Sequence, residues 1–442
     1  MTTLGEVAEL ISGAGFPLEY QGKSGLEYPF FKVGSLATVE PGQELCDAPD
    51  TVDPSMAKTL RAKVIPKNST VFAKIGMAIR LNRRRLVGVP CCIDNNMMAA
   101  VPRAFVEPRF LLRFLETIDL MPITQATTVP SLRRTNLEQI AVPLPPLAEQ
   151  KRIVAKVEEL LARVNAARER LARVPAILKR FRQSILAAAC SGRLTADWRE
   201  ASERECDWPK RRLADLGHVT GGITKNPKRE KLSVHVPYLR VANVYENRLE
   251  LSGVLTIGVT REEFDRTQLV TGDLLFVEGN GSLDQIGRVA LWDGSISRCV
   301  HQNHIIKFRG TGSVLPSFVL YWMMSPQGRA QLIDKASSTS GLHTLSISKI
   351  ADIEMAVPTL GEQQEIASRV NRLLFLVDKI ETHIESTINR VGQATRAILA
   401  KAFLGELVPT EAEFARAESR PYEPASALLT GIRAHRDFPK QK

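Results

Sequence analysis

Two stretches of this chain decide its architecture: residues 147–164 read LAEQKRIVAKVEELLARV, and residues 360–377 read LGEQQEIASRVNRLLFLV. When residues 147–194 are laid on the chain at a constant offset of 213, without a gap, 14 of the 48 positions are identical. The identities include the pair Glu149 and Gln150, which returns as Glu362 and Gln363. We interpret this similarity as an internal duplication, which is sought before other features of a sequence because it decides how the rest is read.

Each stretch begins a long run in which apolar residues alternate at steps of four and three. Five heptads with this spacing are typical of a coiled-coil seam. At 1.5 Å per residue, about 40 residues form a rod of about 60 Å. Pro175 lies inside the first run and is expected to kink or interrupt that helix, because proline lacks a backbone donor. The expected seam residues are Ile153, Val157, Leu160, Val164, Leu171 and Leu178 in the first run, and Ile366, Val370, Leu373, Val377, Ile384 and Val391 in the second.

Two such helices can bury their seams on each other only if they run antiparallel, or else on another partner. Weaker similarity precedes each helix, for example PFFKV at residues 29–33 and PYLRV at 237–241, and short apolar runs there predict strands. The expected fold class is α+β: two mixed α/β domains related by pseudo-twofold symmetry and joined by two long antiparallel coiled-coil helices. The expected order is a domain at 1–146, a helix with its linker at 147–207, a domain at 208–359, a helix at 360–409, and a tail at 410–442 that is either a short helix or loose.

Composition limits the class of protein. With 442 residues, 44% hydrophobic and 24% charged, we expect two to four folded units and no wholesale disorder. No apolar run approaches the ~18 residues of a membrane span, and the first residues do not resemble an export signal. Six cysteines without CxxC spacing favour reduced thiols in a cytoplasm.

The charge balance favours an anionic partner such as nucleic acid, because 59 Lys and Arg stand against 48 Asp and Glu, a net charge of +11. No catalytic motif has the context that its chemistry needs. His301 and His304, three apart in an expected strand, point to opposite faces and are expected to have core or hydrogen-bonding roles rather than to bind a metal. The sequence therefore predicts a non-catalytic binding protein with no metal site.

Basic residues cluster in both expected domains, where they suit contacts with DNA phosphates; solvated surface patches are the alternative. A glycine-rich loop near residue 280 carries polar side chains, which are candidates for base contacts because Asn and Gln pair with adenine in the major groove. This loop aligns loosely with residues 74–80. The candidate DNA-binding residues are Lys74, Arg80, Arg83, Arg84, Arg85, Lys225, Lys228, Arg229, Asn280, Ser282 and Gln285.

At this point the arrangement resembles a known family. AVPLPPLAEQ at residues 141–150 and AVPTLGEQ at 356–363 each lead from a variable domain into a long helix, and this looks like the specificity subunit of type I restriction-modification enzymes. Residues 272–276 and 302–304 are also similar to family patterns, whereas the first domain departs from them at 68–72. The resemblance covers the chain up to about residue 409.

The resemblance implies two target recognition domains, each reading one half of a split, asymmetric sequence in double-stranded DNA. It implies that the paired helices fix the unread spacer and help to recruit two methyltransferase subunits and two restriction (motor) subunits. S-adenosylmethionine would be bound by the methyltransferase, and this cytoplasmic chain would hold no cofactor.

Three alternatives remain open. One is the recognition subunit of a methylation-only system or of a related system that cuts on both sides of its site. Another is a coiled-coil scaffold that binds DNA without sequence preference. The third is a fused methyltransferase, which would require the isolated chain to bind S-adenosylmethionine.

Overall fold

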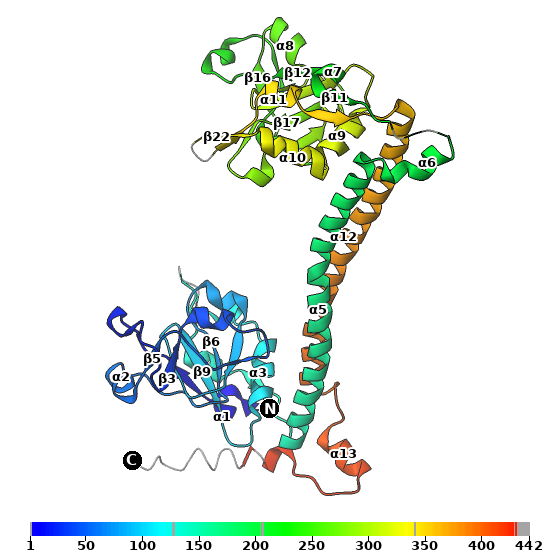
Figure 1. Ribbon diagram of the computed structural model, residues 1–442. Helices are drawn as coiled ribbons and strands as arrows, with labels where there is room; N and C mark the ends of the chain where they lie inside the picture. Colours follow the sequence, from blue (N-terminus) through cyan, green and yellow to red (C-terminus); the bar gives the residue numbers. More distant parts are fainter. Residues whose placement is uncertain are drawn as a thin grey trace. The chain divides into compact units, whose positions relative to one another are not determined.

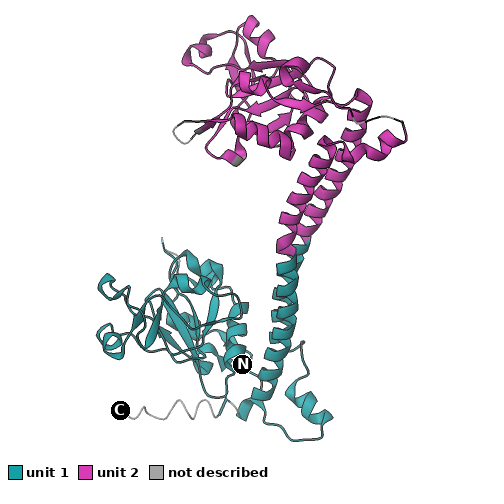
Figure 2. Ribbon diagram, viewed as in Figure 1, with its two compact units in different colours: residues 1–170, 387–442 teal, residues 171–386 magenta. Residues whose placement is uncertain are grey.

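The computed structural model describes residues 2–125, 129–203, 205, 207–339, 342–427 and 429–430 (Figure 1). The chain forms two compact units (Figure 2). Unit 1 comprises residues 1–170 and 387–442, so it is discontinuous in sequence, and unit 2 comprises residues 171–386. Cys206, one of the six cysteines, lies outside the described residues.

Unit 1 is built on two sheets. The larger has five strands in the order β2 (Ala8–Ser12), β9 (Met97–Pro102), β6 (Thr70–Ala73), β7 (Arg84–Val87) and β4 (Glu44–Leu45). The smaller has the order β5 (Thr51–Val52), β3 (Tyr28–Phe31) and β8 (Cys92–Ile93), in which β3 and β8 are parallel. Both sheets alternate with short helices rather than with regular βαβ crossovers.

Unit 2 repeats this topology. Its larger sheet has the order β12 (Gly217–Gly221), β21 (Ile305–Gly310), β17 (Leu274–Val277) and β19 (Val289–Leu291). Its smaller sheet has the order β16 (Leu255–Gly258), β13 (His235–Leu239) and β20 (Val300–His301), again with one parallel pair. The two units therefore have like folds, as the duplication in the sequence predicts.

The units differ in their additions. Unit 2 adds a hairpin of β14 (Val244–Tyr245) and β15 (Arg248–Leu249), and a ribbon of β18 (Gly279–Asn280), β23 (Leu342–Thr344) and β22 (Ser337–Thr339). In both units a short antiparallel pair joins the beginning of the globular part to the strand just before the long helix. These pairs are β1 (Thr2–Thr3) with β10 (Ala141–Val142), and β11 (Lys210–Arg212) with β24 (Glu354–Ala356).

Each unit also contains short helices. In unit 1 these are α1 (Leu4–Val7), α2 (Pro54–Thr59), α3 (Pro108–Thr117), α4 (Arg134–Glu138) and α13 (Glu411–Ala417). In unit 2 these are α6 (Ala196–Glu200), α7 (Leu213–Leu216), α8 (Arg261–Thr267), α9 (Pro316–Met324), α10 (Pro326–Lys335) and α11 (Ile347–Ala351). α3 and α9 each begin with proline, which suits the first helical turn because it needs no backbone donor there. Their buried faces pack in the same apolar clusters as the long helices.

Two 44-residue helices, α5 (Leu147–Cys190) and α12 (Leu360–Phe403), run through both units. Within unit 1, Ile153 and Leu161 share an apolar cluster with Leu399 and Ala402. Within unit 2, Arg182 of α5 pairs with Asp378 and Glu381 of α12, at 2.6 and 2.7 Å. Residues with higher numbers in α5 contact residues with lower numbers in α12. The two helices are therefore antiparallel.

The seam is largely the expected one. Leu161 and Leu374, one residue beyond it, are buried, whereas Leu160 and Leu373 are half-buried. The shift arises because the first turns of each long helix pack against their own globular part as well as against the other helix. Of the expected seam residues, Ile153, Val157, Leu178, Ile366, Val370, Val377 and Ile384 are buried, and Leu160, Val164, Leu171, Leu373 and Val391 are half-buried.

Of the kink or interruption expected at Pro175, the interruption is wrong, because α5 runs as one helix across it. Proline removes one backbone donor, and in this case its side chain is exposed. The tail beyond residue 410 begins with the helix α13, which is capped by the Thr410 side chain. Among the described residues, no helix is both long and apolar enough to cross a bilayer.

Candidate DNA interface

One loop leaves the larger sheet at the equivalent point of each unit. In unit 1, the Lys74 amide donates to Asn96 O at 2.8 Å, and Lys74 O accepts from Leu132 N at 2.9 Å. In unit 2, the Glu278 amide donates to His304 O at 3.0 Å, and its carbonyl accepts from the Leu345 amide at 2.8 Å. We call residues 74–83 the unit-1 loop and residues 278–288 the unit-2 loop. Their matching anchors strengthen the loose alignment made from the sequence.

The unit-1 loop is basic. Gly76 has a φ of +82°, a value that favours glycine, and it turns the chain into a short 3-10 helix, residues 77–81. This helix exposes Arg80, and Arg83 follows it, also exposed. Lys74 is half-buried at the base of the loop, where burial lowers the pKa of its ammonium. Arg80 and Arg83 are thus placed where a phosphate could reach them.

Arg84 and Arg85 differ from the exposed cluster expected from the sequence, because both lie in β7 and are buried. They pair with Phe72 and Val71 of β6, so they sit within the ladder of the larger sheet. The Arg85 guanidinium donates to Val39 O at 3.0 and 3.2 Å and to Arg84 O at 2.9 Å. The sequence run therefore divides into an exposed part and a part built into the fold.

The basic segment of unit 2 divides in the same way. Lys225 and Lys228 are exposed, but Arg229 is bound to both carboxylate oxygens of Glu263, at 2.9 and 2.7 Å. Arg229 also donates to Gly258 O at 3.2 Å. This pairing lowers the pKa of Glu263 to about 2. Arg229 thus fastens its segment to the smaller sheet, whereas the two lysines face solvent.

The unit-2 loop is polar, with two acidic residues and one arginine, where the unit-1 loop is basic. Asn280 lies in β18, paired with His343 of β23, and its side-chain oxygen accepts from the Ser282 amide at 2.9 Å. Ser282 and Gln285 are exposed beyond this turn. The pairing of β18 with β23 holds the base of the loop and leaves Ser282 and Gln285 exposed at its end, where they are suitable for contacts with base edges.

The two histidines do not share a strand as expected from the sequence, because His301 ends β20 and His304 lies in the turn before β21. The His301 ring is buried, with Nδ1 2.9 Å from Ile305 O, and burial lowers its pKa to about 4. His304 is exposed and its Nδ1 lies 2.8 Å from a Glu278 oxygen. No group of three or more His, Cys, Asp or Glu side chains in the described part of the chain is arranged to hold a metal ion.

The Glu–Gln pair that is duplicated in sequence is also duplicated in structure. Gln150 accepts from the Glu107 amide at 2.8 Å and donates to Pro145 O at 2.9 Å. Gln363 accepts from the Leu315 amide at 2.7 Å and donates to Pro358 O at 2.8 Å. Each glutamine thus joins the first turn of a long helix to the helix α3 or α9 of its own globular part. This explains why the motif leads into both helices.

The glutamates of the pair are held differently. Glu362 accepts from Thr195 at 2.8 Å, from Arg199, and from the Trp208 indole at 3.0 Å, and the Trp208 ring lies edge-on to Phe318. Glu149 accepts from the Glu411 amide of the tail at 2.6 Å.

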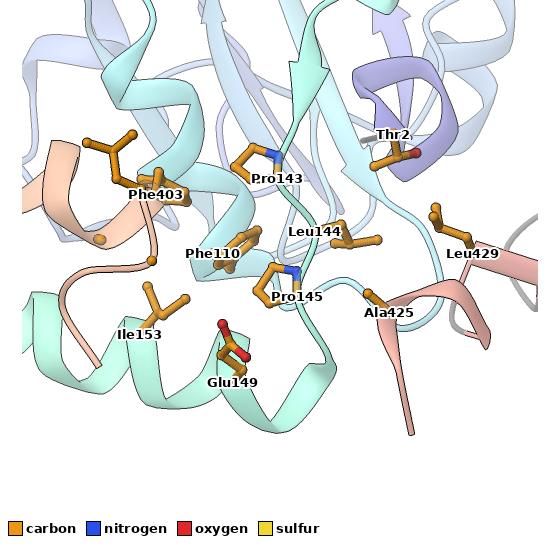
Figure 3. A pocket seen from close by; sticks show the side chains of 13 residues that line it. Thr2, Phe110, Pro143, Leu144, Pro145, Glu149, Ile153, Phe403, Ala425 and Leu429 are labelled. Carbon is orange, nitrogen blue, oxygen red and sulfur yellow. The ribbon is translucent and has the colours of Figure 1, made fainter. Parts of the chain in front are cut away.

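Beside Glu149 lies a cavity of about 330 Å³ whose lining includes Phe110, Ile153, Phe403 and Leu429 (Figure 3). Phe110 is the third residue of α3, as Phe318 is of α9. In unit 1 the Phe403 ring packs on Phe110 beside this cavity, with 5.1 Å between the ring centroids, whereas in unit 2 Trp208 packs on Phe318.

A second cavity of unit 1, of about 380 Å³, is lined by six arginines. We call it the arginine cavity; its arginines are Arg83, Arg84, Arg85, Arg113, Arg168 and Arg396. The sequence analysis missed the last three, because they come from α3, α5 and α12 and approach the others only in the fold. A charged residue on each helix near the loop is the only signal that the sequence offers for them.

Comparison with known proteins shows what this arrangement is similar to. Residues 1–175 and 205–390 match the family described as the type I restriction modification DNA specificity domain. The specificity subunit of the type I restriction enzyme EcoKI from Escherichia coli (strain K12) is 32% identical over 324 residues, which cover 71% of this chain and 68% of the relative. The corresponding StySPI subunit from Salmonella potsdam is 30% identical over 345 residues, covering 76% and 73%.

Solved structures show the same fold. A chain from a type I R-M system has a TM-score of 0.67 at 19% identity, and the match covers 92% of this chain and 97% of the other. The HsdS subunit from Thermoanaerobacter tengcongensis has a TM-score of 0.55 at 20% identity, covering 92% and 96%. At these identities the likeness establishes the fold and nothing finer.

Proposed function

The chain belongs to the family of type I restriction-modification DNA specificity domains, and from this membership we propose that it is the DNA sequence-recognition subunit of such a complex. It reads a bipartite, asymmetric target in double-stranded DNA, one half with each unit. It acts in the cytoplasm, where the DNA is.

The observation that carries the proposal is that two units of like topology present unlike loops at the same point of the fold. The unit-1 loop offers Arg80 and Arg83, and the unit-2 loop offers Asn280 and Gln285. Arginine pairs with guanine, and asparagine or glutamine with adenine, in the major groove. Unlike loops therefore favour an asymmetric target, while Lys225 and Lys228 supply contacts with phosphates.

The helices α5 and α12 are proposed to fix the number of unread base pairs between the two halves. Both helices continue from one unit into the other, so their length is a covalent property of the chain. A helix rises 1.5 Å per residue, and DNA rises about 3.4 Å per base pair. Each added heptad thus corresponds to about three base pairs.

The same helices are proposed to bind the partner subunits. Five large apolar side chains on their unit-2 part are about half exposed, namely Ile177, Phe181, Phe375, Leu376 and Ile380. Exposed apolar side chains on a helix pair are typical of a protein interface. We propose that two methyltransferase subunits dock on the duplicated helices and that two restriction subunits join the complex. Catalysis and S-adenosylmethionine then belong to these partners, and this chain holds no cofactor.

The test is methylome sequencing of cells that express the chain with its methyltransferase. The proposal predicts methylation at one split motif. A variant with seven residues inserted after Arg170 and seven after Ser386 is expected to methylate the same two half-sequences with a spacer about three base pairs longer. Altered half-sequences would contradict the role of the helices, and methylation without a motif would contradict the proposed function.

A further inference from the structure

Among the described residues of unit 1, two neighbouring guanidinium groups are buried without a hydrogen bond to a carboxylate. The carboxylates that act on them through space are Glu116 and Asp119 for Arg84, and Glu116 and Glu40 for Arg85. Arg84 and Arg85 are 2% and 6% exposed. Arg84 donates to Ile118 O at 3.0 Å and to the Asn82 side chain, and its Nε is buried with no hydrogen-bond partner among the described residues. All acceptors of both side chains are neutral. Buried charges in proteins are normally paired with an opposite charge, because desolvation of an isolated ion is costly.

The fold itself does not require arginines in these places. The positions of Arg84 and Arg85 in the sheet ladder are taken in unit 2 by Val289 and Ala290, both buried. The sixth residue of the covering helix is Arg113 in α3 and Tyr321 in α9. An apolar ladder is therefore compatible with the shared topology, and the charges of unit 1 call for a separate reason.

That reason lies in the arginine cavity. Arg84, Arg85 and Arg113 are the buried arginines of its lining, and Arg83, Arg168 and Arg396 are exposed at its edge. Among its lining residues the acid is Glu116, which is bound to Arg113 at 2.9 Å. Six arginines and one acid thus line a cavity of about 380 Å³, and Arg113 also lies 3.8 Å from Glu158, which is outside the lining.

The long helices repeat the contrast with unit 2. At the offset of 213 that relates the two helices, Arg168 corresponds to Glu381, and Arg396 corresponds to Gln183. Glu381 forms an ion pair with Arg182 at 2.7 Å. The equivalent place in unit 2 is thus internally balanced, whereas that in unit 1 carries an excess of positive charge.

We propose that the arginine cavity of unit 1 binds a phosphate anion. The planar guanidinium fork matches the oxygens of a phosphate group, which is why arginine prevails in such sites. The excess charge suits a group with more than one phosphate, either a run of the DNA backbone or a free polyphosphate. Burial lowers the pKa of Arg84 to about 10, although the charges of Glu116 and Asp119 act in the opposite direction. The DNA source rests on the proposed function.

The free-anion source is tested by titrating the full chain with inorganic pyrophosphate in an isothermal calorimeter at low salt. The edge variant Arg83→Ala/Arg396→Ala should weaken binding at least tenfold, without a change in folding because both side chains are exposed. Arg84→Val/Arg85→Ala, which installs the residues of unit 2, should do the same. Arg163→Ala, an exposed arginine of the same helix α5, is the control and should leave the affinity unchanged.

The DNA source is tested with the chain assembled with its methyltransferase on target duplex. The slope of log K against log salt should fall by about two for the edge variant if DNA phosphates occupy the cavity, and should be unchanged for Arg163→Ala. Either pyrophosphate binding lost in the variants, or this smaller slope, supports the proposal and identifies the source. If neither changes, the proposal is wrong, and sequence-specific methylation by the same variant would show that the proposed function stands without it.

Discussion

The first turns of the two long helices carry the same Glu–Gln pair, but the glutamates accept hydrogen bonds from different segments of the chain. Gln150 and Gln363 make equivalent bonds to their own globular parts. The carboxylate of Glu362 accepts hydrogen bonds from Thr195, Arg199 and Trp208, and that of Glu149 accepts one from the main chain of the tail. In both units the closing residues follow the C-terminal end of the antiparallel partner helix. The bond to the globular part has thus been kept after duplication, while the closing segment has diverged.

Removal of the two glutamates should break this comparison most strongly. Glu362→Ala leaves Arg199 buried and unpaired, so we expect it to lower the free energy of unfolding of unit 2 by about 3–5 kcal/mol. Glu149→Ala removes one charged hydrogen bond and should cost about 1–2 kcal/mol in unit 1. All four tryptophans, at 198, 208, 292 and 322, lie in unit 2, so tryptophan fluorescence during urea unfolding reports on that unit alone. The loss in unit 1 is measured by hydrogen exchange of the β6 amides. Equal losses would show that the two closures are energetically alike.

The glutamines should behave alike. Gln150→Ala and Gln363→Ala each leave a buried amide and a carbonyl without their partner, which should cost about 2 kcal/mol in the unit concerned. Hydrogen exchange of the β6 and β17 amides measures both units in one experiment. A loss in one unit only would contradict the equivalence inferred from the matching distances.

The ion pair between Arg229 and Glu263 gives unit 2 a dependence on pH. Because the pKa of Glu263 is lowered to about 2 in the folded state from an ordinary value of 4.5, the pair stabilises above about pH 4.5 and loses this contribution as the pH falls toward 2. Both side chains are partly exposed, so we expect about 1–2 kcal/mol near neutral pH. The difference between wild type and Glu263→Gln, followed by tryptophan fluorescence, should shrink between pH 5 and pH 2. A constant difference would exclude the carboxylate as its source.

The smallest effects on stability are expected for Arg152 and Arg369, which form ion pairs near Glu149 and Glu362. Arg152 pairs with the buried Glu411 at 2.6 Å and stacks on Phe414, so Arg152→Ala should cost about 1 kcal/mol in unit 1. Arg369 pairs with the exposed Asp197, and Arg369→Ala should cost about 0.5 kcal/mol in unit 2. Thermal unfolding at two salt concentrations checks this, since salt screens the second pair more. The reverse order would indicate that the tail contributes little to unit 1.

The repeat of the two helices and the likeness of the two units could be predicted from the sequence, because a heptad pattern and an internal identity are local or additive signals. The sequence could not predict which residues of the basic clusters are exposed and which are buried. Arg84 and Arg85 look like surface residues until the strand ladder places them beside Val71 and Phe72. Arg229 looks free until folding brings it to Glu263, 34 residues away.

Pro175 shows the opposite error, since α5 continues across it as one helix. The expected domain boundaries and the candidate DNA contacts remain predictions. The arginine cavity lay beyond the reach of the sequence because three segments far apart in the chain build it.

The closure of Glu149 by Glu411 has a consequence for the order of synthesis. Unit 2 is one continuous stretch, so all of its residues are translated before α12 is finished. Unit 1 must wait for residues that are translated some 260 positions after Glu149, as the 262-residue separation of that hydrogen bond shows. Unit 1 is therefore begun first and completed last. A nonsense codon near residue 405 would damage unit 1 and leave the residues of unit 2 complete.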